Sequence, residues 1–161
     1  MKKITVFALL CAALLALAGC GGSEDPGCRD DVAAADIAEQ VCTALGKDDM
    51  VAMDDTYLQN AMQLDSSEFS DYAVMVNSKG ANIDEFGIFK AGDSGVSAAE
   101  EAVRGYLQFR LDTWMPEYMP EELPKLENAG VRVCGNYVMY AILSDSEAET
   151  AFSEFESALE A

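Results

Sequence analysis

The sequence predicts an α+β fold in which a four-stranded antiparallel sheet carries helices mainly on one face. Helix-like and strand-like patterns follow one another in the order α, ββ, α, ββ, α along residues 32–161. A Gly-Asn pair between two β-rich runs predicts a tight hairpin in the second half of the chain. Pairs of consecutive strands, with helices between the pairs, favour an antiparallel sheet whose helices lie apart from the strands.

The first predicted element is a helix over residues 32–45. Its start follows an acidic pair, Asp30-Asp31, and its end precedes Gly46, a residue typical of helix ends. Apolar residues recur at helical spacing along it, namely Ile37, Val41 and Leu45. A second, short helix is expected over residues 55–62.

Two strands are predicted next, over residues 71–77 and 83–90. The first alternates Tyr72, Val74 and Val76 against Ala73 and Met75, which predicts one well-buried face. The second is rich in apolar residues: Phe86, Ile88 and Phe89. The turn between the two strands is expected at residues 80–82.

A long helix is predicted over residues 97–114. Ser97 and Glu100 have the spacing of a capping box, in which each side chain binds a free amide of the first turn. The helix must stop before Pro116. Residues 115–128 contain three of the four prolines and are expected to cross irregularly to the next strand.

The hairpin is predicted to join strands over residues 130–134 and 137–143 through Gly135-Asn136. This register pairs Cys134 with Tyr137 and Val133 with Val138. One face then carries the expected core residues Val131, Val133, Val138, Tyr140 and Ile142. The opposite face carries Arg132, Cys134, Tyr137 and Met139. The final helix is predicted over residues 145–159, capped by Ser144 or Ser146.

Residues 1–19 have the pattern of a secretory signal peptide. Two lysines precede a 14-residue apolar run, Ile4 to Leu17, which is short for a helix that must span a bilayer with about 20 residues. The following Leu17-Ala18-Gly19-Cys20 resembles the lipobox of bacterial lipoproteins. The resemblance implies cleavage before Cys20 and acylation of Cys20, so the lipid bilayer is the expected partner. Residues 20–31 would form a tether to one domain, 32–161, outside the cytoplasm.

The chain is strongly acidic, with 29 acidic and 10 basic residues and a formal net charge of −19. Removal of residues 1–19 would take away two lysines and leave 8 − 29 = −21. This balance argues against binding to nucleic acid, because phosphate contacts require a basic surface. A basic partner or bound cations remain open, beside a simple role of the charge in solubility.

Three cysteines would remain beside Cys20 after processing: Cys28, Cys42 and Cys134. Outside the cytoplasm they allow at most one internal disulfide and leave one thiol over. A Cys42–Cys134 bond would join the first helix to the sheet, whereas a Cys28–Cys42 bond would join the tether to that helix. The sequence leaves the pairing open.

The residue types exclude several chemistries. The chain has no histidine, so Ser-His-Asp and Cys-His catalysis and histidine zinc sites are ruled out. No spacing of a calcium loop, a phosphate-binding loop or a dinucleotide motif is present, so we expect no metal and no cofactor. The expected binding residues lie on the second hairpin face and on the long helix: Arg132, Tyr137, Met139, Arg104 and Arg110.

Three segments, in this order and spacing, resemble one bacterial lipoprotein family: residues 83–90, residues 118–128 with Tyr118-Met119-Pro120-Glu121-Glu122, and Gly135-Asn136-Tyr137-Val138. The family carries the domain of unknown function numbered 4358, and the resemblance spans about residues 32–159. It supports the location and the fold but supplies no catalytic residue. We therefore expect a membrane-anchored, non-catalytic binding or accessory module of the cell envelope, with an envelope protein as a candidate partner. The alternatives are a small envelope hydrolase that uses carboxylates and a module that binds cations or small ligands.

Overall fold

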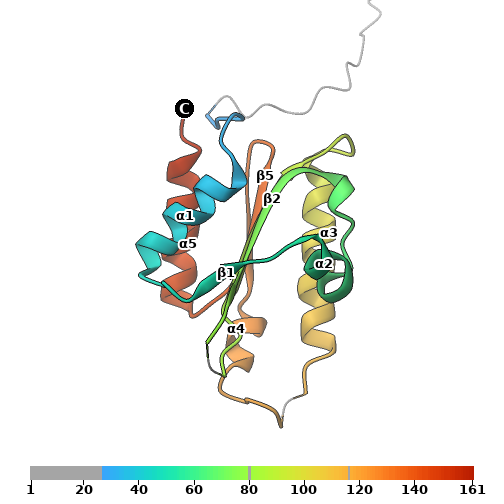
Figure 1. The fold of residues 1–161 in the computed structure, drawn as a ribbon, viewed down its shortest axis with the longest axis vertical. Helices are drawn as coiled ribbons and strands as arrows, with labels where there is room; N and C mark the ends of the chain where they lie inside the picture. Colours follow the sequence, from blue (N-terminus) through green and yellow to red (C-terminus); the bar gives the residue numbers. More distant parts are fainter. Residues whose placement is uncertain (1–26, 80, 116) are drawn as a thin grey trace, which may run out of the picture.

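The computed structural model describes residues 27–79, 81–115 and 117–161 (Figure 1). The predicted signal peptide, the acylation site Cys20, most of the predicted tether and Gly80 of the predicted turn lie outside these ranges. Within them, five antiparallel strands form one sheet in the order β1-β2-β3-β5-β4. The strands are β1 (Met50–Ala52), β2 (Phe69–Asn77), β3 (Glu85–Ala91), β4 (Gly130–Cys134) and β5 (Tyr137–Ile142).

The fold class is mixed helix and sheet, as predicted, but the predicted number of four strands is wrong. The additional strand is β1, which pairs with the far half of β2 through Met50–Asn77, Val51–Val76 and Ala52–Met75. Three residues are too few to show the period-two alternation that identifies a strand. The paired residues of β1 and β2 are 23 to 27 positions apart in the chain, from Ala52–Met75 to Met50–Asn77. No local signal in the sequence therefore marks the pairing.

The helices lie on both faces of the sheet. They are α1 (Ala34–Leu45), α2 (Asp55–Tyr57) with a π-helical turn over Leu58–Met62, α3 (Val96–Asp112), α4 (Leu123–Glu127) and α5 (Asp145–Ala158). In Figure 1, α1 and α5 cover one face and α3 covers the other. The prediction of helices mainly on one face is therefore wrong.

The central strands explain this arrangement. Every residue of β5 is buried, and so are the first five residues of β3. A strand that is apolar without alternation is typical of burial on both faces. The run Tyr137 to Leu143 already has this property in the sequence, and one helical layer could not cover both of its faces.

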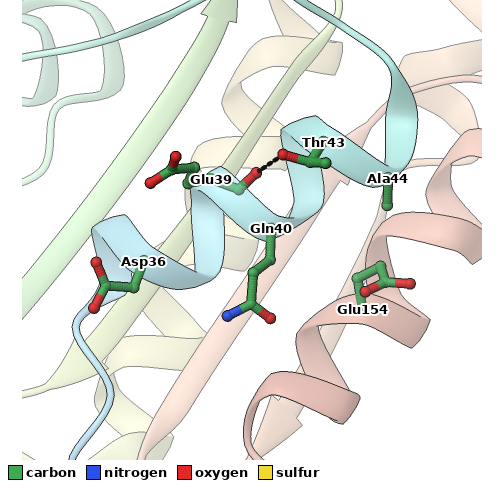
Figure 2. A pocket seen from close by; sticks show the side chains of 6 residues that line it. All are labelled: Asp36, Glu39, Gln40, Thr43, Ala44 and Glu154. Carbon is green, nitrogen blue, oxygen red and sulfur yellow. Dashed lines mark hydrogen bonds between the residues drawn. The ribbon is translucent and has the colours of Figure 1, made fainter.

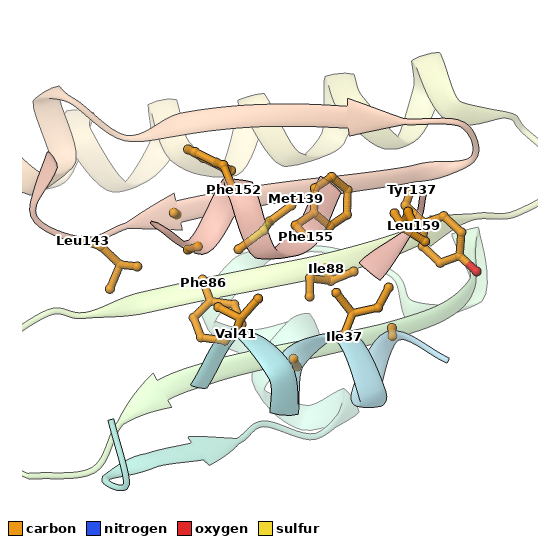
Figure 3. Close-up of a cluster of buried hydrophobic side chains, with 14 residues drawn as sticks. Ile37, Val41, Phe86, Ile88, Tyr137, Met139, Leu143, Phe152, Phe155 and Leu159 are labelled. Carbon is orange, nitrogen blue, oxygen red and sulfur yellow. The ribbon is translucent and has the colours of Figure 1, made fainter. Parts of the chain in front are cut away.

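Two apolar cores flank the sheet. Figure 3 shows the core under α1 and α5, where Ile37 and Val41 meet side chains of β3, β5 and α5. The opposite core packs α3 and the Leu58–Met62 turn on the other face. Its fully buried members include Leu58, Val74, Phe89, Val103, Val138, Tyr140 and Ile142.

The local predictions about turns and caps have mixed outcomes. The hairpin register is confirmed, since Cys134 pairs with Tyr137 and Val133 with Val138. Gly135 has φ of 54°, a backbone conformation that favours glycine. Ser144 caps α5 in a capping box with Glu147. The capping box predicted at Ser97 is wrong, because α3 begins at Val96 after Gly95 and places Ser97 inside its first turn.

Gly87 on β3 should not tolerate a side chain. A Cβ atom there would lie 2.4 Å from Cε1 of the Tyr140 ring, which is completely buried and held by a hydrogen bond from its hydroxyl. We expect Gly87→Ala to lower the free energy of unfolding by about 1–3 kcal/mol, as overpacked cores do. Urea denaturation of the purified protein measures this change.

The matched control is Gly105→Ala on the exposed side of α3, where a Cβ atom meets nothing within 4 Å. This substitution should raise the free energy of unfolding by about 0.5–1 kcal/mol, because alanine restricts the unfolded chain and favours helix. Equal effects of the two substitutions would contradict the packing described for Gly87.

Candidate functional site

Two adjacent buried carboxylates stand where β3 begins. Asp84 is 3% exposed and Glu85 is 1% exposed, and each is surrounded by a different set of donors. Buried acids are the usual starting point in a search for a catalytic site, since burial and neighbouring charges tune their protonation.

Glu85 is enclosed by three tyrosines and one arginine. Its Oε1 accepts hydrogen bonds from the hydroxyls of Tyr106 (2.5 Å) and Tyr140 (2.6 Å). Its Oε2 accepts from Arg110 Nη1 (2.8 Å) and from the Tyr57 hydroxyl (3.0 Å). We call these five residues the Glu85 cage. They join the Asp55–Met62 segment, α3, β3 and β5.

Burial and charge keep the three tyrosines and the arginine of the cage in one protonation state. Burial, followed by the charge of Glu85, raises the pKa of Tyr57 to about 12 and raises the pKa of Tyr106 and Tyr140 well above the ordinary value. Burial by itself would lower the pKa of Arg110, but the charges of Glu85 and Tyr106 and the hydrogen bonds to both residues together outweigh burial and raise it. The three phenols therefore remain donors, and the arginine remains charged.

Asp84 is the centre of a second network. One of its carboxylate oxygens accepts a hydrogen bond from Lys47 Nζ (2.5 Å) and the other accepts one from Lys125 Nζ (2.6 Å). Lys47 also pairs with Glu147 (2.9 Å), and Lys125 also pairs with Glu122 (2.8 Å). The network thus connects the loop after α1, the start of β3, α4 and the first turn of α5.

Neither network has the geometry of an active site. A general acid or base must reach a proton on a substrate, whereas Asp84 and Glu85 are buried and already hold donors on both oxygens. In the described part of the chain, no group of three or more acids or cysteines is arranged to hold a metal ion. We infer that the two networks fix the layers of the fold.

The strongest candidate for binding is a groove between α1 and the β1 edge of the sheet, which we call the edge groove. Its volume is about 360 Å³. Helix α1 packs over β2 and β3, and residues of α1, β1 and β2 line the groove. The apolar walls come from small or sulfur-containing residues: Ala38, Cys42, Met50, Ala52, Ala73 and Met75.

A second groove runs between α1 and α5 (Figure 2) and has polar walls. Asp36, Glu39 and Glu154 contribute three carboxylates, and Gln40 and Thr43 lie between them. Thr43 donates its hydroxyl to the backbone carbonyl of Glu39 (2.9 Å). The edge groove has the larger share of apolar surface, so it is the better candidate for a defined ligand.

The binding face expected on the hairpin is not a free surface. Tyr137 and Met139 are completely buried under α1 and α5, so the expectation that they are exposed is wrong. The Tyr137 hydroxyl donates to the carbonyl of Val32 (2.7 Å) at the approach to α1. The physical reason is the second helical layer, which the alternation within the hairpin alone does not reveal.

The three arginines expected to bind lie apart from one another. Arg132 is exposed on β4, with its guanidinium 4.8 Å from the centre of the Phe152 ring. Arg104 pairs with Glu100 on the surface of α3 (2.7 Å). Arg110 points inward to Glu85. The predicted residues therefore do not form one site.

Sequence reasoning missed the Glu85 cage, although one signal was available. Residues two apart on a strand share a face, so Glu85 belongs to the same face as Gly87 and Phe89. An acid on an otherwise apolar face of a buried strand requires donors. The donors come from residues 57 to 140, and their convergence is visible only in three dimensions.

Comparison with known proteins shows which family the chain belongs to. The family model described as "Domain of unknown function (DUF4358)" matches residues 43–143, more than half of the chain. The chain belongs to this family. No curated protein and no solved structure matches it.

The whole Glu85 cage lies inside the matched part of this DUF4358 protein, from Tyr57 to Tyr140. Most of α1 and all of α5 lie outside it, as does Cys28. Among the described residues, no helix has the length and apolar character needed to cross a membrane.

One disulfide links the matched and unmatched parts. Cys28 is bonded to Cys134 at the end of β4, and Cys42 is a free thiol. Neither of the two pairings considered from the sequence is therefore present. Glu160 forms a β-bridge with Cys28, so the start of the described chain and its last residues meet beside the hairpin turn.

Proposed function

We propose that this protein is a lipoprotein anchored through acylated Cys20, whose domain lies outside the cytoplasm and binds a partner without catalysing a reaction. The lipobox-like Leu17-Ala18-Gly19-Cys20 and the signal-like residues 1–19 support the anchor. Two or more acyl chains hold a protein stably in a bilayer.

The Cys28–Cys134 disulfide is the observation that carries the proposal. Disulfides persist in oxidising compartments and are rare in the cytoplasm. Neither cysteine belongs to the leader, so the bond supports export independently of the leader.

The disulfide also sets the orientation that we propose for the domain. Cys28 follows Cys20 by eight residues, which span at most roughly 29 Å when fully extended. The membrane would therefore lie near the end of the domain that holds the β4–β5 turn. Helix α4 lies toward the opposite end (Figure 1) and would point away from the membrane.

A binding role without catalysis fits the described site. The buried acids are saturated with donors, while the edge groove offers apolar surface with a polar rim. Histidine is absent from the whole chain. These features favour recognition over acid–base or nucleophilic chemistry.

The anchor is tested by Cys20→Ser in a bacterial host grown with radiolabelled palmitate. The unchanged chain should incorporate label and sediment with membranes, and the variant should lose the label completely. Cys42→Ser is the matched control and should keep both properties. Label that remains on the Cys20→Ser variant would contradict the proposal.

A further inference from the structure

We propose that the open edge of β1 and the adjoining edge groove bind an extended, apolar peptide segment of a protein partner that carries basic residues at both ends. The segment would add to the sheet as a further strand. This inference deepens the binding role proposed above and names its surface and its partner chemistry.

Strand β1 presents unpaired backbone groups. Met53 donates its amide to Val74 O (2.9 Å), and Asp49 O accepts from the Ser78 amide (2.8 Å), so Asp49 and Met53 face β2. In an antiparallel pair the inward and outward residues alternate. Met50 and Ala52 therefore direct their amides and carbonyls to the free side, where the described chain provides no neighbouring strand.

The two edge strands of the sheet, β1 and β4, differ in the features that prevent pairing with another chain. Edge strands of soluble proteins usually carry charges or other features that prevent pairing with another chain. Strand β4 carries Arg132 and is tied at its end by the Cys134 disulfide. Strand β1 and the residue after it, Met50-Val51-Ala52-Met53, carry no charge, and Val51 is 44% exposed.

The edge groove lies directly beside this free edge. Met50 and Ala52 of β1, Ala73 and Met75 of β2 and Cys42 of α1 all line the groove. Alternate side chains of an added strand point to the same face. The apolar side chains of the added segment would thus enter the groove while its backbone pairs with Met50 and Ala52.

Charge defines the ends of the partner segment. The apolar edge is bracketed by Asp48-Asp49 and Asp54-Asp55, and none of these four carboxylates forms an ion pair within the residues that the structure describes. A second copy of this chain would bring four more carboxylates to them and would be repelled. Basic residues that flank an apolar core of the segment are complementary.

The binding assay uses the full chain in detergent and a synthetic nonapeptide, acetyl-Lys-Lys-Val-Thr-Val-Thr-Val-Lys-Lys-amide, with a fluorescent label. We expect saturable binding with a dissociation constant in the micromolar range, because only two residues of β1 offer outward hydrogen bonds. A peptide of equal charge with proline at the central position should bind about tenfold more weakly, since proline cannot pair as a strand.

Variants of the strand locate the site. Ala52→Pro removes the outward amide without removing a hydrogen bond to β2, and it should weaken binding about tenfold. Val51→Lys places a positive charge on the exposed edge and should have a similar effect. Val133→Lys is the matched control, because Val133 is 43% exposed on the opposite edge strand, and it should bind as the unchanged chain does. Thermal unfolding verifies that each variant is folded.

Two double substitutions test whether the acidic residues beside β1 attract the basic ends of the peptide. Asp48→Asn with Asp49→Asn should weaken binding several-fold and reduce its dependence on salt. Asp93→Asn with Glu101→Gln removes the same charge from exposed positions elsewhere and should have no more than a small effect.

The proposal is overturned if the nonapeptide does not bind, if its proline version binds equally well, or if folded Ala52→Pro and Val51→Lys variants bind like the Val133→Lys control. Self-association of the chain that Ala52→Pro abolishes would overturn it as well. The assay does not depend on acylation, so a failure of the membrane anchor would appear only in the palmitate experiment.

Discussion

Replacing Glu85 with leucine should lower the free energy of unfolding by about 3–5 kcal/mol, the range observed when one partner of a buried ion pair is removed. The substitution leaves the Arg110 guanidinium, which is mostly buried, without its carboxylate. It also removes the acceptor of the hydroxyls of Tyr57, Tyr106 and Tyr140. A loss of this size is comparable with the whole stability of many domains. Urea denaturation followed by circular dichroism measures it.

The matched control is Glu100→Leu, which removes the carboxylate from the exposed Arg104–Glu100 pair on the same helix that supplies Arg110. Surface pairs contribute about 0–1 kcal/mol, so this variant should remain close to the unchanged chain. The double substitution Glu85→Leu with Arg110→Leu should recover part of the loss, because no unpaired charge remains buried. Equal effects of Glu85→Leu and Glu100→Leu would contradict the cage.

Removing the disulfide by Cys134→Ser should lower the free energy of unfolding by about 2–5 kcal/mol. The bond spans 106 residues, and closure of so long a loop strongly restricts the unfolded chain. It also holds Cys28 beside the hairpin, where Arg29 N donates to Leu159 O (2.7 Å). Thermal and urea unfolding with and without a reductant measure the effect.

Two controls accompany this variant. Cys42→Ser should change the stability little, because Cys42 is a free thiol and is only partly buried. Addition of a reductant to the unchanged chain should reproduce the loss and should not affect the Cys134→Ser variant further. A Cys42→Ser variant that loses as much stability as Cys134→Ser would contradict the pairing.

Elements with local signals were predictable from the sequence. The hairpin register follows from Gly135-Asn136, because a two-residue turn determines which residues face each other. The helices α1, α3 and α5 follow from apolar spacing, within a few residues at their ends. The cap of α5 was predicted as Ser144 or Ser146, and Ser144 forms it in a capping box with Glu147 three residues later.

Features that depend on distant contacts were not predictable in this way. Strand β1 is recognised by its pairing with β2, and the Cys28–Cys134 bond joins residues 106 positions apart. The burial of Tyr137 and Met139 depends on α1 and α5, which come from opposite ends of the described chain. The uninterrupted run of apolar residues along β5 was the one signal in the sequence that helices cover both faces of the sheet.

The central claim is a processed, acylated chain that contains one disulfide and one free thiol. The most direct test is the intact mass of the chain isolated from cells and alkylated in denaturant without reduction. The account predicts loss of residues 1–19, the added mass of acyl chains and one alkylated cysteine, Cys42. A chain that keeps residues 1–19 and takes up five alkyl groups, one on each of its five cysteines, would contradict the account.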